Sequence, residues 1–238
     1  MQGPSPAKIK NIFSSVAHGY DKANDAMTFG LARRWRRQLV HWSGVRVSET
    51  VLDCATGTGD LAFEFKRAVG LQGRVIGTDF CEEMLTEARL KAEKQRVSVD
   101  FVPADAHQLP FPDNSFDVSS MAYGIRNVQN PLTVIAQMAR VVKPNGRVMI
   151  LETGDSQARG LKPLMDFYCR EIVPRVGGWI TGQRAAYEYL NESSRKFPSR
   201  EKFVEMMLST GAFSGVSFQV LMGGASFIYN GKVKDLKT

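Results

Sequence analysis

A turn that contains two glycines follows a buried apolar run early in the chain. It reads Val-Leu-Asp-Cys-Ala-Thr-Gly-Thr-Gly-Asp over 51–60. Gly57 and Gly59 allow positive φ and close backbone approach, so main-chain N–H groups and the next helix N-terminus can face a polar or anionic ligand. A methionine carboxylate would fit there, and Asp53 and Thr58 join the glycines as candidate cofactor contacts. The same turn is also a common structural link between a strand and a helix, so alone it identifies no ligand.

Acidic residues follow the next two apolar runs. Asp79 ends the second run, twenty residues after Gly59, where a carboxylate can accept hydrogen bonds from both hydroxyls of an adenosine ribose. Asp105 and Ala106 follow the third run and can hold the adenine edge through a side chain and a backbone N–H. Asp105 is equally well explained as a helix N-cap or loop aspartate. Together, the glycine turn and Asp79 indicate a cofactor that contains adenosine.

The charge of the turn separates two such cofactors. A nicotinamide site favours G-x-G-x-x-G, whereas 57–62 reads Gly-Thr-Gly-Asp-Leu-Ala and ends with alanine. Asp60 would repel a pyrophosphate but attract a ligand that carries an ammonium and a sulfonium. The sequence therefore favours S-adenosylmethionine, and a nicotinamide-dependent oxidoreductase is the poorer alternative.

The elements that position these residues follow a βα pattern. Helical periodicity separates most of the first five apolar runs, which predicts parallel strands buried on both faces. The last two runs flank a Met-Gly-Gly-Ala turn and predict an antiparallel hairpin. We therefore expect an α/β, Rossmann-like class I methyltransferase fold with a mostly parallel seven-stranded sheet. The predicted strands are Val51–Ala55, Arg74–Phe80, Val97–Ala104, Phe116–Ala122, Arg147–Thr153, Val216–Leu221 and Ser226–Asn230.

A length of 238 residues with 43% hydrophobic content suits one globular domain. Breaker residues punctuate the segment before its last part, at Pro163, Pro174 and Gly177-Gly178, and predict irregular helices. The expected parts are an N-terminal helical lid over 1–48, a cofactor-binding core over 49–153, a helical cap insertion over 154–198, and a final helix with the hairpin over 199–238.

Two local signals mark element ends. Lys143-Pro144-Asn145-Gly146 predicts a turn that closes a helix and leads into the fifth strand. Ser199 is the expected N-cap of a final helix that ends near Ser209.

The net charge of +7 favours anionic partners such as nucleic acid, acidic lipid or phosphorylated ligands, without choosing among them. No signal peptide and no apolar run of about 20 residues are evident, so we expect a cytoplasmic protein. The cysteines and histidines lack metal-ligand spacing, which predicts no metal and a reducing compartment. These residues are Cys54, Cys81, Cys169, His18, His41 and His107.

The most specific motif is Tyr-Gly-Ile-Arg-Asn-Val over 123–128. With the segments at the end of this paragraph, it makes nearly the whole chain resemble the ubiquinone/menaquinone-biosynthesis C-methyltransferases, within the class I S-adenosylmethionine-dependent enzymes. The resemblance implies methyl transfer to a ring carbon of a prenylated quinol, with Thr58, Asp79, Asp105 and Ala106 at cofactor positions. The other matching segments are Tyr20–Asp25, Phe29-Gly30, Gly57–Asp60, Leu109–Asp117, Arg140–Arg147, Tyr189-Leu190, Ser193-Ser194, Phe197-Pro198 and Gly223-Gly224.

Two positions depart from that family's pattern. Ala55 replaces the first glycine that is common in methyltransferase turns, and Ala122 stands where relatives often have serine. The missing hydroxyl puts one cofactor contact in doubt. The reaction class is unaffected, because backbone groups and Asp79 supply most of the expected polar contacts.

The implied reaction needs an ionised quinol, whose oxyanion pushes electron density onto the attacking ring carbon. Phenolic hydroxyls titrate near 10, and an adjacent cation lowers such a pKa by about 1–3 units. Arg126 is the expected electrostatic stabiliser and Asn127 the group that aligns the quinol oxygen. Tyr20, Asp21 and Tyr123 are further candidates near the quinol. Alternatively, Arg126 braces its loop by an ion pair and the two tyrosines are core aromatics.

A prenylated quinol resides in a bilayer, so the enzyme is expected to meet this partner at the membrane surface. Arg33–Arg37, with Trp35 and Trp42, suits an interfacial helix, or else is a solvated basic face. The irregular helices between Pro163 and Tyr189 could form an apolar entrance for the tail.

Several alternatives stay open. The nearest is an O- or N-methyltransferase of another small molecule. A nucleic-acid-binding protein is the more distant one, because only 33–37 combines basic and aromatic residues, and no nucleic acid is expected. The sequence also leaves room for a homodimer, and it does not choose between a naphthoquinol and a benzoquinol ring.

Overall fold

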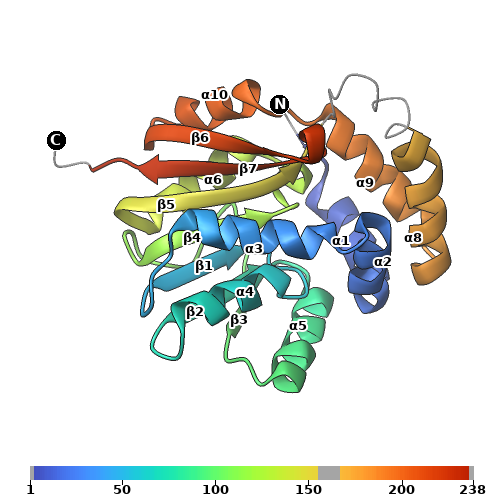
Figure 1. The fold of residues 1–238 in the computed structure, drawn as a ribbon, viewed down its shortest axis with the longest axis horizontal. Coiled ribbons are helices and arrows are strands. Elements are labelled where there is room, and N and C mark those ends of the chain that lie inside the picture. The colour runs from blue at the N-terminus through green and yellow to red at the C-terminus, as the bar shows by residue number, and fades with distance from the viewer. Residues whose placement is uncertain (1–2, 155–166, 236–238) are drawn as a thin grey trace.

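The computed structural model describes residues 3–154 and 167–235. Its seven strands form one sheet in the order β3-β2-β1-β4-β5-β7-β6, parallel from β3 to β5 and antiparallel in the β5–β7 and β6–β7 pairs (Figure 1). The predicted fold class is confirmed. The strands are β1(Thr50–Cys54), β2(Arg74–Asp79), β3(Asp100–Pro103), β4(Phe116–Ala122), β5(Val142–Thr153), β6(Phe213–Leu221) and β7(Ser226–Val233).

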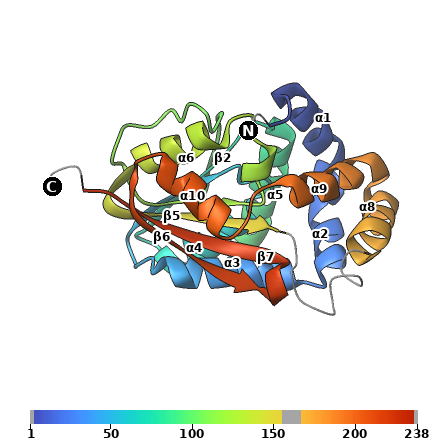
Figure 2. The ribbon, with the colours of Figure 1, turned by 90° about the horizontal axis from the view of Figure 1, so that it is seen from above.

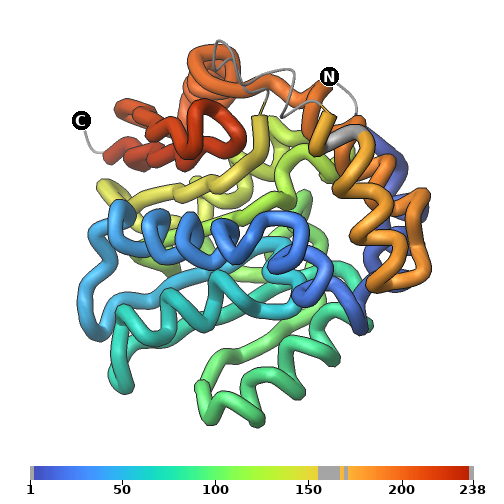
Figure 3. Tube along the Cα trace, turned by 45° about the vertical axis from the view of Figure 1, so that its right-hand side comes forward, coloured from blue at the N-terminus to red at the C-terminus, as the bar shows by residue number. Residues whose placement is uncertain are grey.

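Helices cover both faces of this sheet and one of its ends. Figure 2 shows α6 and α10 on one face and α3 and α4 on the other, while α1, α2, α8 and α9 gather at the end that Figure 3 turns forward. The helices are α1(Pro6–Val16), α2(Tyr20–Thr28), α3(Leu31–Ser43), α4(Asp60–Val69), α5(Glu82–Gln95), α6(Pro131–Arg140), α8(Val173–Thr181), α9(Arg184–Lys196) and α10(Glu201–Ser209). Four short helical turns are η1(Ala17–Gly19), η2(Ile125–Asn127), η3(Tyr168–Ile172) and η4(Met222–Gly224).

The two faces of the central strands bury separate apolar clusters. Leu52 of β1 faces the cluster under α6 and α10, whereas Val51 faces the cluster under α3 and α4. Both side chains are fully buried, as expected for a strand with helices on each side. Helical periodicity supplies the matching apolar stripes, for example Leu61 and Phe65 on α4. No helix among the described residues is long and apolar enough to cross a bilayer.

Four strands differ in length by more than one residue from their predictions: β6 and β7 each extend three residues further from their turn, and the third and fifth differ as well. β3 is shorter, because the cap of α5 includes Val97, whose N–H donates to the Ala92 carbonyl at 3.0 Å. β5 is longer, since its pairing with β4 resumes on both sides of the predicted 143–146 turn. Asn145, at φ 63°, forms an irregularity inside the strand. The turn residues were therefore recognised, but their place between a helix and a strand was wrong.

Two predictions for the C-terminal part, one helix cap and one helix break, are also wrong. Ser199 is not the helix cap, since Arg200 precedes α10 and no side chain caps it. Gly177-Gly178 lies inside α8 instead of breaking it. A Cβ at Gly177 would lie 2.5 Å from Cγ of the Tyr187 ring, so glycine is needed there for helix packing. Pro174 occupies the first turn of α8, and Pro163 lies outside the described residues.

Gly177→Ala is therefore expected to destabilise the protein. The added methyl group collides with the buried Tyr187 ring, and such overpacking costs about 1–3 kcal/mol. Urea unfolding of both proteins measures the loss. Gly215→Ala is the matched control, because a Cβ there meets no atom within 4 Å, and equal effects of the two changes would contradict the packing role.

Candidate active site

The carboxylate of Asp79 holds the glycine turn in place. Its Oδ2 accepts a hydrogen bond from the Gly57 N–H at 2.9 Å, and its Oδ1 accepts one from the Cys81 N–H at 2.9 Å. Gly57 has φ 57° and a Cβ there would meet open space, which leaves a cradle for a ligand above the turn. Gly59 has another role, since a Cβ there would lie 2.9 Å from the Phe101 ring. The turn thus needs glycine once for ligand access and once for packing.

Asp53 lies beneath the same turn and is buried. Thr56 Oγ1 donates to its Oδ2 at 2.6 Å, and Ser120 Oγ donates to its Oδ1 at 2.7 Å. Burial raises the pKa of Asp53 to about 6, and the two hydroxyl donors offset part of that rise. Asp53 therefore fastens the turn to β4.

A cavity of about 820 Å³, its open mouth included, lies where the parallel strands end. Ile9 and Phe13 of α1 close one side, and they are contacts that the sequence analysis missed; only the amphipathic pattern of α1 pointed to them. Three predicted cofactor residues, Asp53, Thr58 and Gly59, lie outside its lining. The predicted site residues that do line it are Gly57, Asp79, Asp105, Ala106, Tyr20, Tyr123 and Asn127.

Asp105 is fixed by its neighbour His107. Asp105 Oδ1 accepts hydrogen bonds from the His107 backbone N–H at 2.9 Å and lies 2.6 Å from its Nδ1. His107 Nε2 in turn accepts from the Asn130 N–H at 3.1 Å, so the proton belongs on Nδ1. Burial raises the pKa of Asp105, but the His107 hydrogen bonds outweigh it and the pKa is lowered. Asp105 is thus an ionised acceptor at the cavity wall.

A second cavity, of about 1500 Å³ with its mouth, lies beside the first. Tyr20 and Tyr123 line both cavities, so the two meet at these rings. The wall of the second cavity is mainly apolar and comes from α2, α3, the η3–α9 segment and the tip of the β6–β7 hairpin. Its polar members include Arg126, Thr153 and Ser194. The two cavities are therefore adjacent, with Tyr20 and Tyr123 on the wall of each.

Arg126 lies at the wall of the second cavity and is itself buried. It forms an ion pair with Glu152, whose side chain is only 2% exposed. Its Nη1 also donates to the Tyr123 carbonyl at 3.2 Å, while Nε is buried with no partner among the described residues. The bracing ion pair is present, and Arg126 is at the same time part of the cavity wall. Sequence reasoning missed Glu152, although its place near the end of the fifth strand was the available signal.

The remaining candidates near Arg126 are Tyr20, Tyr123 and Asn127, and the last two each have a buried oxygen without a hydrogen-bond partner among the described residues. Burial raises the pKa of Tyr123 to about 12 and also raises that of Tyr20, so both phenols stay protonated at neutral pH. Asn127 Nδ2 donates to the Tyr123 carbonyl at 3.2 Å. Its Oδ1 is buried and has no partner within the described residues. An orphaned acceptor of this kind is suited to bind a ligand donor.

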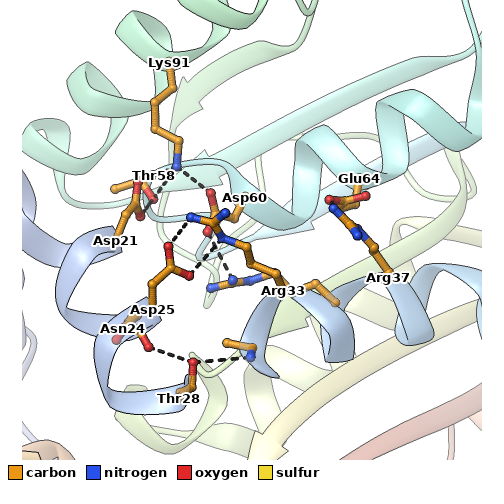
Figure 4. A network of polar contacts seen from close by, with 12 residues as sticks. Asp21, Asn24, Asp25, Thr28, Arg33, Arg37, Thr58, Asp60, Glu64 and Lys91 are labelled. Atoms are coloured by element: carbon orange, nitrogen blue, oxygen red, sulfur yellow. Dashed lines mark hydrogen bonds and ion pairs between the residues drawn. The ribbon is translucent and has the colours of Figure 1, made fainter. Parts of the chain in front are cut away.

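Asp21, Thr58 and Asp60 belong to a charged network outside the cofactor cavity (Figure 4). Asp21 Oδ1 accepts from Thr58 Oγ1 at 2.6 Å, and Lys91 Nζ donates to Asp21 Oδ2 at 2.6 Å and to Asp60 Oδ1 at 2.5 Å. Arg36 lies 3.1 Å from Asp60. Burial raises the pKa of Asp60, but Arg36 and Lys91 outweigh it and the pKa is lowered. The expectation that Asp60 attracts a cationic cofactor is wrong, because protein cations neutralise it.

The same network changes the interpretation of the basic run. Arg33 pairs with Asp25, and Arg37 pairs with Glu64 (Figure 4). Trp35 and Arg36 are buried. These two side chains cannot face lipid or solvent, whereas Arg33, Arg34 and Arg37 are exposed, so a membrane contact of this run stays a prediction. Most of the run binds neighbouring helices.

Comparison with known proteins identifies the family of this chain. Residues 1–233 match the ubiE/COQ5 methyltransferase family. The chain belongs to this family. It is therefore an S-adenosylmethionine-dependent methyltransferase, and the fold, the enzyme class and the resemblance expected from the sequence are confirmed.

The relatives match along almost their entire length. The ubiquinone/menaquinone biosynthesis C-methyltransferase UbiE of Bdellovibrio bacteriovorus is 48% identical over 231 residues, covering 97% of this chain and 98% of the relative. The UbiE of Idiomarina loihiensis is 40% identical, covering 94% of this chain and 89% of the relative. Members of the ubiE/COQ5 family thus share this chain's overall extent.

Solved structures with lower identity share the fold. A SAM-dependent methyltransferase from Thermotoga maritima has a TM-score of 0.65 at 19% identity, covering 94% of this chain and 99% of that one. One from Aquifex aeolicus has a TM-score of 0.60 at 21% identity, covering 83% of this chain and 89% of that one.

Among the described residues no group of three or more His, Cys, Asp or Glu side chains could hold a metal.

The buried Asp53 predicts an unusual pH dependence of stability. Its pKa of about 6 in the folded state lies above the usual value near 3.9, so folding disfavours its charged form. Its favourable contribution is complete below pH 4 and is lost as the pH rises through 6, by about 3 kcal/mol. Asp53→Asn does not titrate, so the stability of wild type relative to this variant should fall by that amount from pH 4 to pH 7.

Urea unfolding of both proteins across this pH range measures the difference. Asp113→Asn is the matched control, since it makes the same chemical change at a carboxylate that is 65% exposed. A constant difference between wild type and Asp53→Asn would contradict the raised pKa.

Asp79→Asn should weaken binding of S-adenosylmethionine by about 10–100-fold. The substitution removes a charged acceptor, and hydrogen bonds to charged groups contribute about 1.5–3 kcal/mol. Calorimetric titration measures the change. Asp100→Asn serves as control, because this half-exposed side chain pairs with Arg74 outside the cavity. Unchanged binding by Asp79→Asn would remove Asp79 from the cofactor site.

Proposed function

We propose that this enzyme transfers the methyl group of S-adenosylmethionine to a ring carbon of a prenylated quinol. The observation that carries the proposal is the meeting of the two cavities at Tyr20 and Tyr123. A cavity whose wall carries two carboxylates adjoins a more apolar one whose wall includes the buried Arg126. Relatives at 48% and 40% identity are named as ubiquinone/menaquinone biosynthesis C-methyltransferases, which supports the same chemistry in this chain.

The first cavity, with Asp79 and Asp105 on its wall, suits the cofactor. Asp79 would accept hydrogen bonds from the ribose hydroxyls, and Asp105 with the Ala106 N–H would hold the adenine. Gly57 leaves open space for the methionine part. The bound cofactor supplies an electrophilic methyl group on a sulfonium. Thr58, Gly59 and Asp53 would act by shaping the turn.

The apolar cavity suits the quinol and the first part of its tail. Arg126 would stabilise the quinol oxyanion, and Asn127 Oδ1 would accept from its other hydroxyl. Tyr20 and Tyr123 would hold the ring between them, while Asp21 positions α2 through Thr58 and Lys91. Arg126 and the two tyrosines line this cavity, whereas Asn127 lines the adjacent one and would reach the quinol from there.

The mouth of the apolar cavity suits contact with lipid. Phe29 is 79% exposed and Met222 is 58% exposed, and both line this cavity. Exposed apolar side chains at an entrance can enter the acyl region of a bilayer, where a prenyl tail resides. We therefore place the enzyme in the cytoplasm, peripheral on the membrane. A homodimer and the absence of nucleic-acid binding stay predictions from the sequence.

Single-turnover transfer from labelled S-adenosylmethionine tests the reaction. The acceptors are reduced demethylmenaquinone and the reduced 2-methoxy-6-polyprenyl-1,4-benzoquinone precursor. Methylated product from either acceptor supports the proposal and identifies the ring. Intact cofactor binding with no product from either would overturn it in favour of another small-molecule methyltransferase.

Arg126→Ala tests the catalytic assignment in the same assay. Loss of one preorganised electrostatic group typically reduces a rate by about 10²–10³-fold, and we expect that loss with cofactor binding retained. Arg34→Ala, on the exposed face of α3, should keep the wild-type rate. An unimpaired Arg126→Ala enzyme would contradict the role of Arg126.

A further inference from the structure

Two hydroxyls at the wall of the apolar cavity form a directed chain of hydrogen bonds. Ser194 Oγ of α9 donates to Thr153 Oγ1 at the end of β5, at 2.6 Å. Thr153 Oγ1 donates in turn to Glu152 Oε1 at 3.1 Å. Ser194 and Thr153 line the cavity, whereas Glu152 lies behind them and is 2% exposed. The chain thus runs from the cavity to a buried carboxylate.

Glu152 is held as an acceptor by several donors. The Thr153 N–H donates to Oε1 at 2.7 Å, and the Arg126 N–H donates to Oε2 at 3.4 Å. The Arg126 guanidinium binds Oε1 as well. The other titratable groups that face this carboxylate are the phenols of Tyr123 and Tyr229. Both phenols have a raised pKa because of burial, so neither competes for a proton near neutral pH.

We infer that Ser194 and Thr153 relay the proton of the substrate hydroxyl to Glu152, which is the proton acceptor of the methyl transfer. The inference rests on the proposed function. The Ser194 hydroxyl uses its hydrogen toward Thr153, so toward a ligand its oxygen can act only as an acceptor. Because Ser194 lines the cavity, a donor group of a bound ligand can supply that hydrogen bond. A quinol hydroxyl is such a donor.

The methyl transfer moves protons along these contacts in both directions. The substrate O–H bond breaks and its proton moves to Ser194, while Ser194 passes its own proton to Thr153 and Thr153 passes one to Glu152. The ring carbon forms a bond to the methyl group, and the bond from methyl to sulfur breaks to leave a neutral sulfide. The hydrogen on that carbon then leaves as a proton to water at the open mouth. The proton on Glu152 returns along the relay to the ring oxygen.

The relay also removes the negative charge of Glu152 that offsets the positive charge of Arg126. While Glu152 is ionised, the ion pair offsets the guanidinium charge. Once Glu152 accepts the proton, this offset disappears just as the substrate oxygen becomes negative. Arg126 then stabilises the oxyanion with its full charge. The ion pair and the catalytic role of Arg126 are therefore compatible.

Thr153→Val removes the central hydroxyl with little change of shape, and Thr153→Ser restores it. In single-turnover assays at pH 7, Thr153→Val should lose about 10²-fold in rate, as expected for loss of general base catalysis. Thr153→Ser should recover the rate to within a few-fold. Ser194→Ala tests the outer end, and Ser193→Ala is its matched control, because Ser193 Oγ donates to the Leu190 carbonyl and does not line the cavity.

The pH profile separates a relay from a structural role. Without the relay, the quinol must ionise in solution, so the rates of Thr153→Val and Ser194→Ala should rise about tenfold per pH unit from 7 to 9. The wild-type rate should rise less steeply. Wild-type turnover with unchanged rates and pH profiles in both variants would overturn the relay alone. Failure of the wild type to methylate either quinol would overturn the proposed function and the relay together.

Discussion

The hydrogen bonds from two strand-to-helix turns to the Asp79 carboxylate are the constraint on which the cofactor cavity depends. Gly57 lies in the first turn and Cys81 in the second, and each donates a backbone N–H to one oxygen of Asp79. The spacing of the turns is therefore fixed by one carboxylate that also faces the cavity. Parallel pairing of β1 with β2 brings both turns to the same edge, so the site follows directly from the sheet.

Ion pairs connect this edge to the helices that cover it. Lys91 of α5 binds Asp21 of α2 and Asp60 of α4, and Thr58 of the turn donates to the same Asp21. These charges are partly buried, with 20–32% of each side chain exposed, so removal of one member leaves another without its partner in a medium of lower dielectric than water. The N-terminal helices are thus bound to the glycine turn itself, and Tyr20 is placed between the cavities by its neighbour Asp21.

Much of the fold and of the cofactor site could be predicted from local patterns. The parallel strands and the antiparallel hairpin followed from periodicity and turn residues, whereas the strand order came from the structure. Gly57, Asp79, Asp105 and Ala106 line one cavity because strand ends meet at one edge. Asp60 was misjudged because its cations, Arg36 and Lys91, come from distant parts of the chain.

The other errors have the same physical origin. Gly177 looked like a helix breaker, whereas its lack of a side chain admits the Tyr187 ring from another helix. Glu152 was not predicted as a site residue, because its role depends on contacts with residues that are distant in the sequence, such as Arg126. Long-range pairing and packing, unlike periodicity, leave no local signature.

The two cavities are built from different structural units. The loops that follow the first strands form the cavity beside Asp79 with α1, while α2, α3, the η3–α9 segment and the hairpin tip form most of the more apolar one. Asp79 accepts its hydrogen bonds from Gly57 and Cys81, which lie outside the second set, and α2 is the one member of that set described here as bound to the turn, through Asp21 and Thr58. Acceptor preference can therefore diverge during evolution while methyl-donor binding is conserved, which makes this architecture a modular scaffold in which one half is exchangeable.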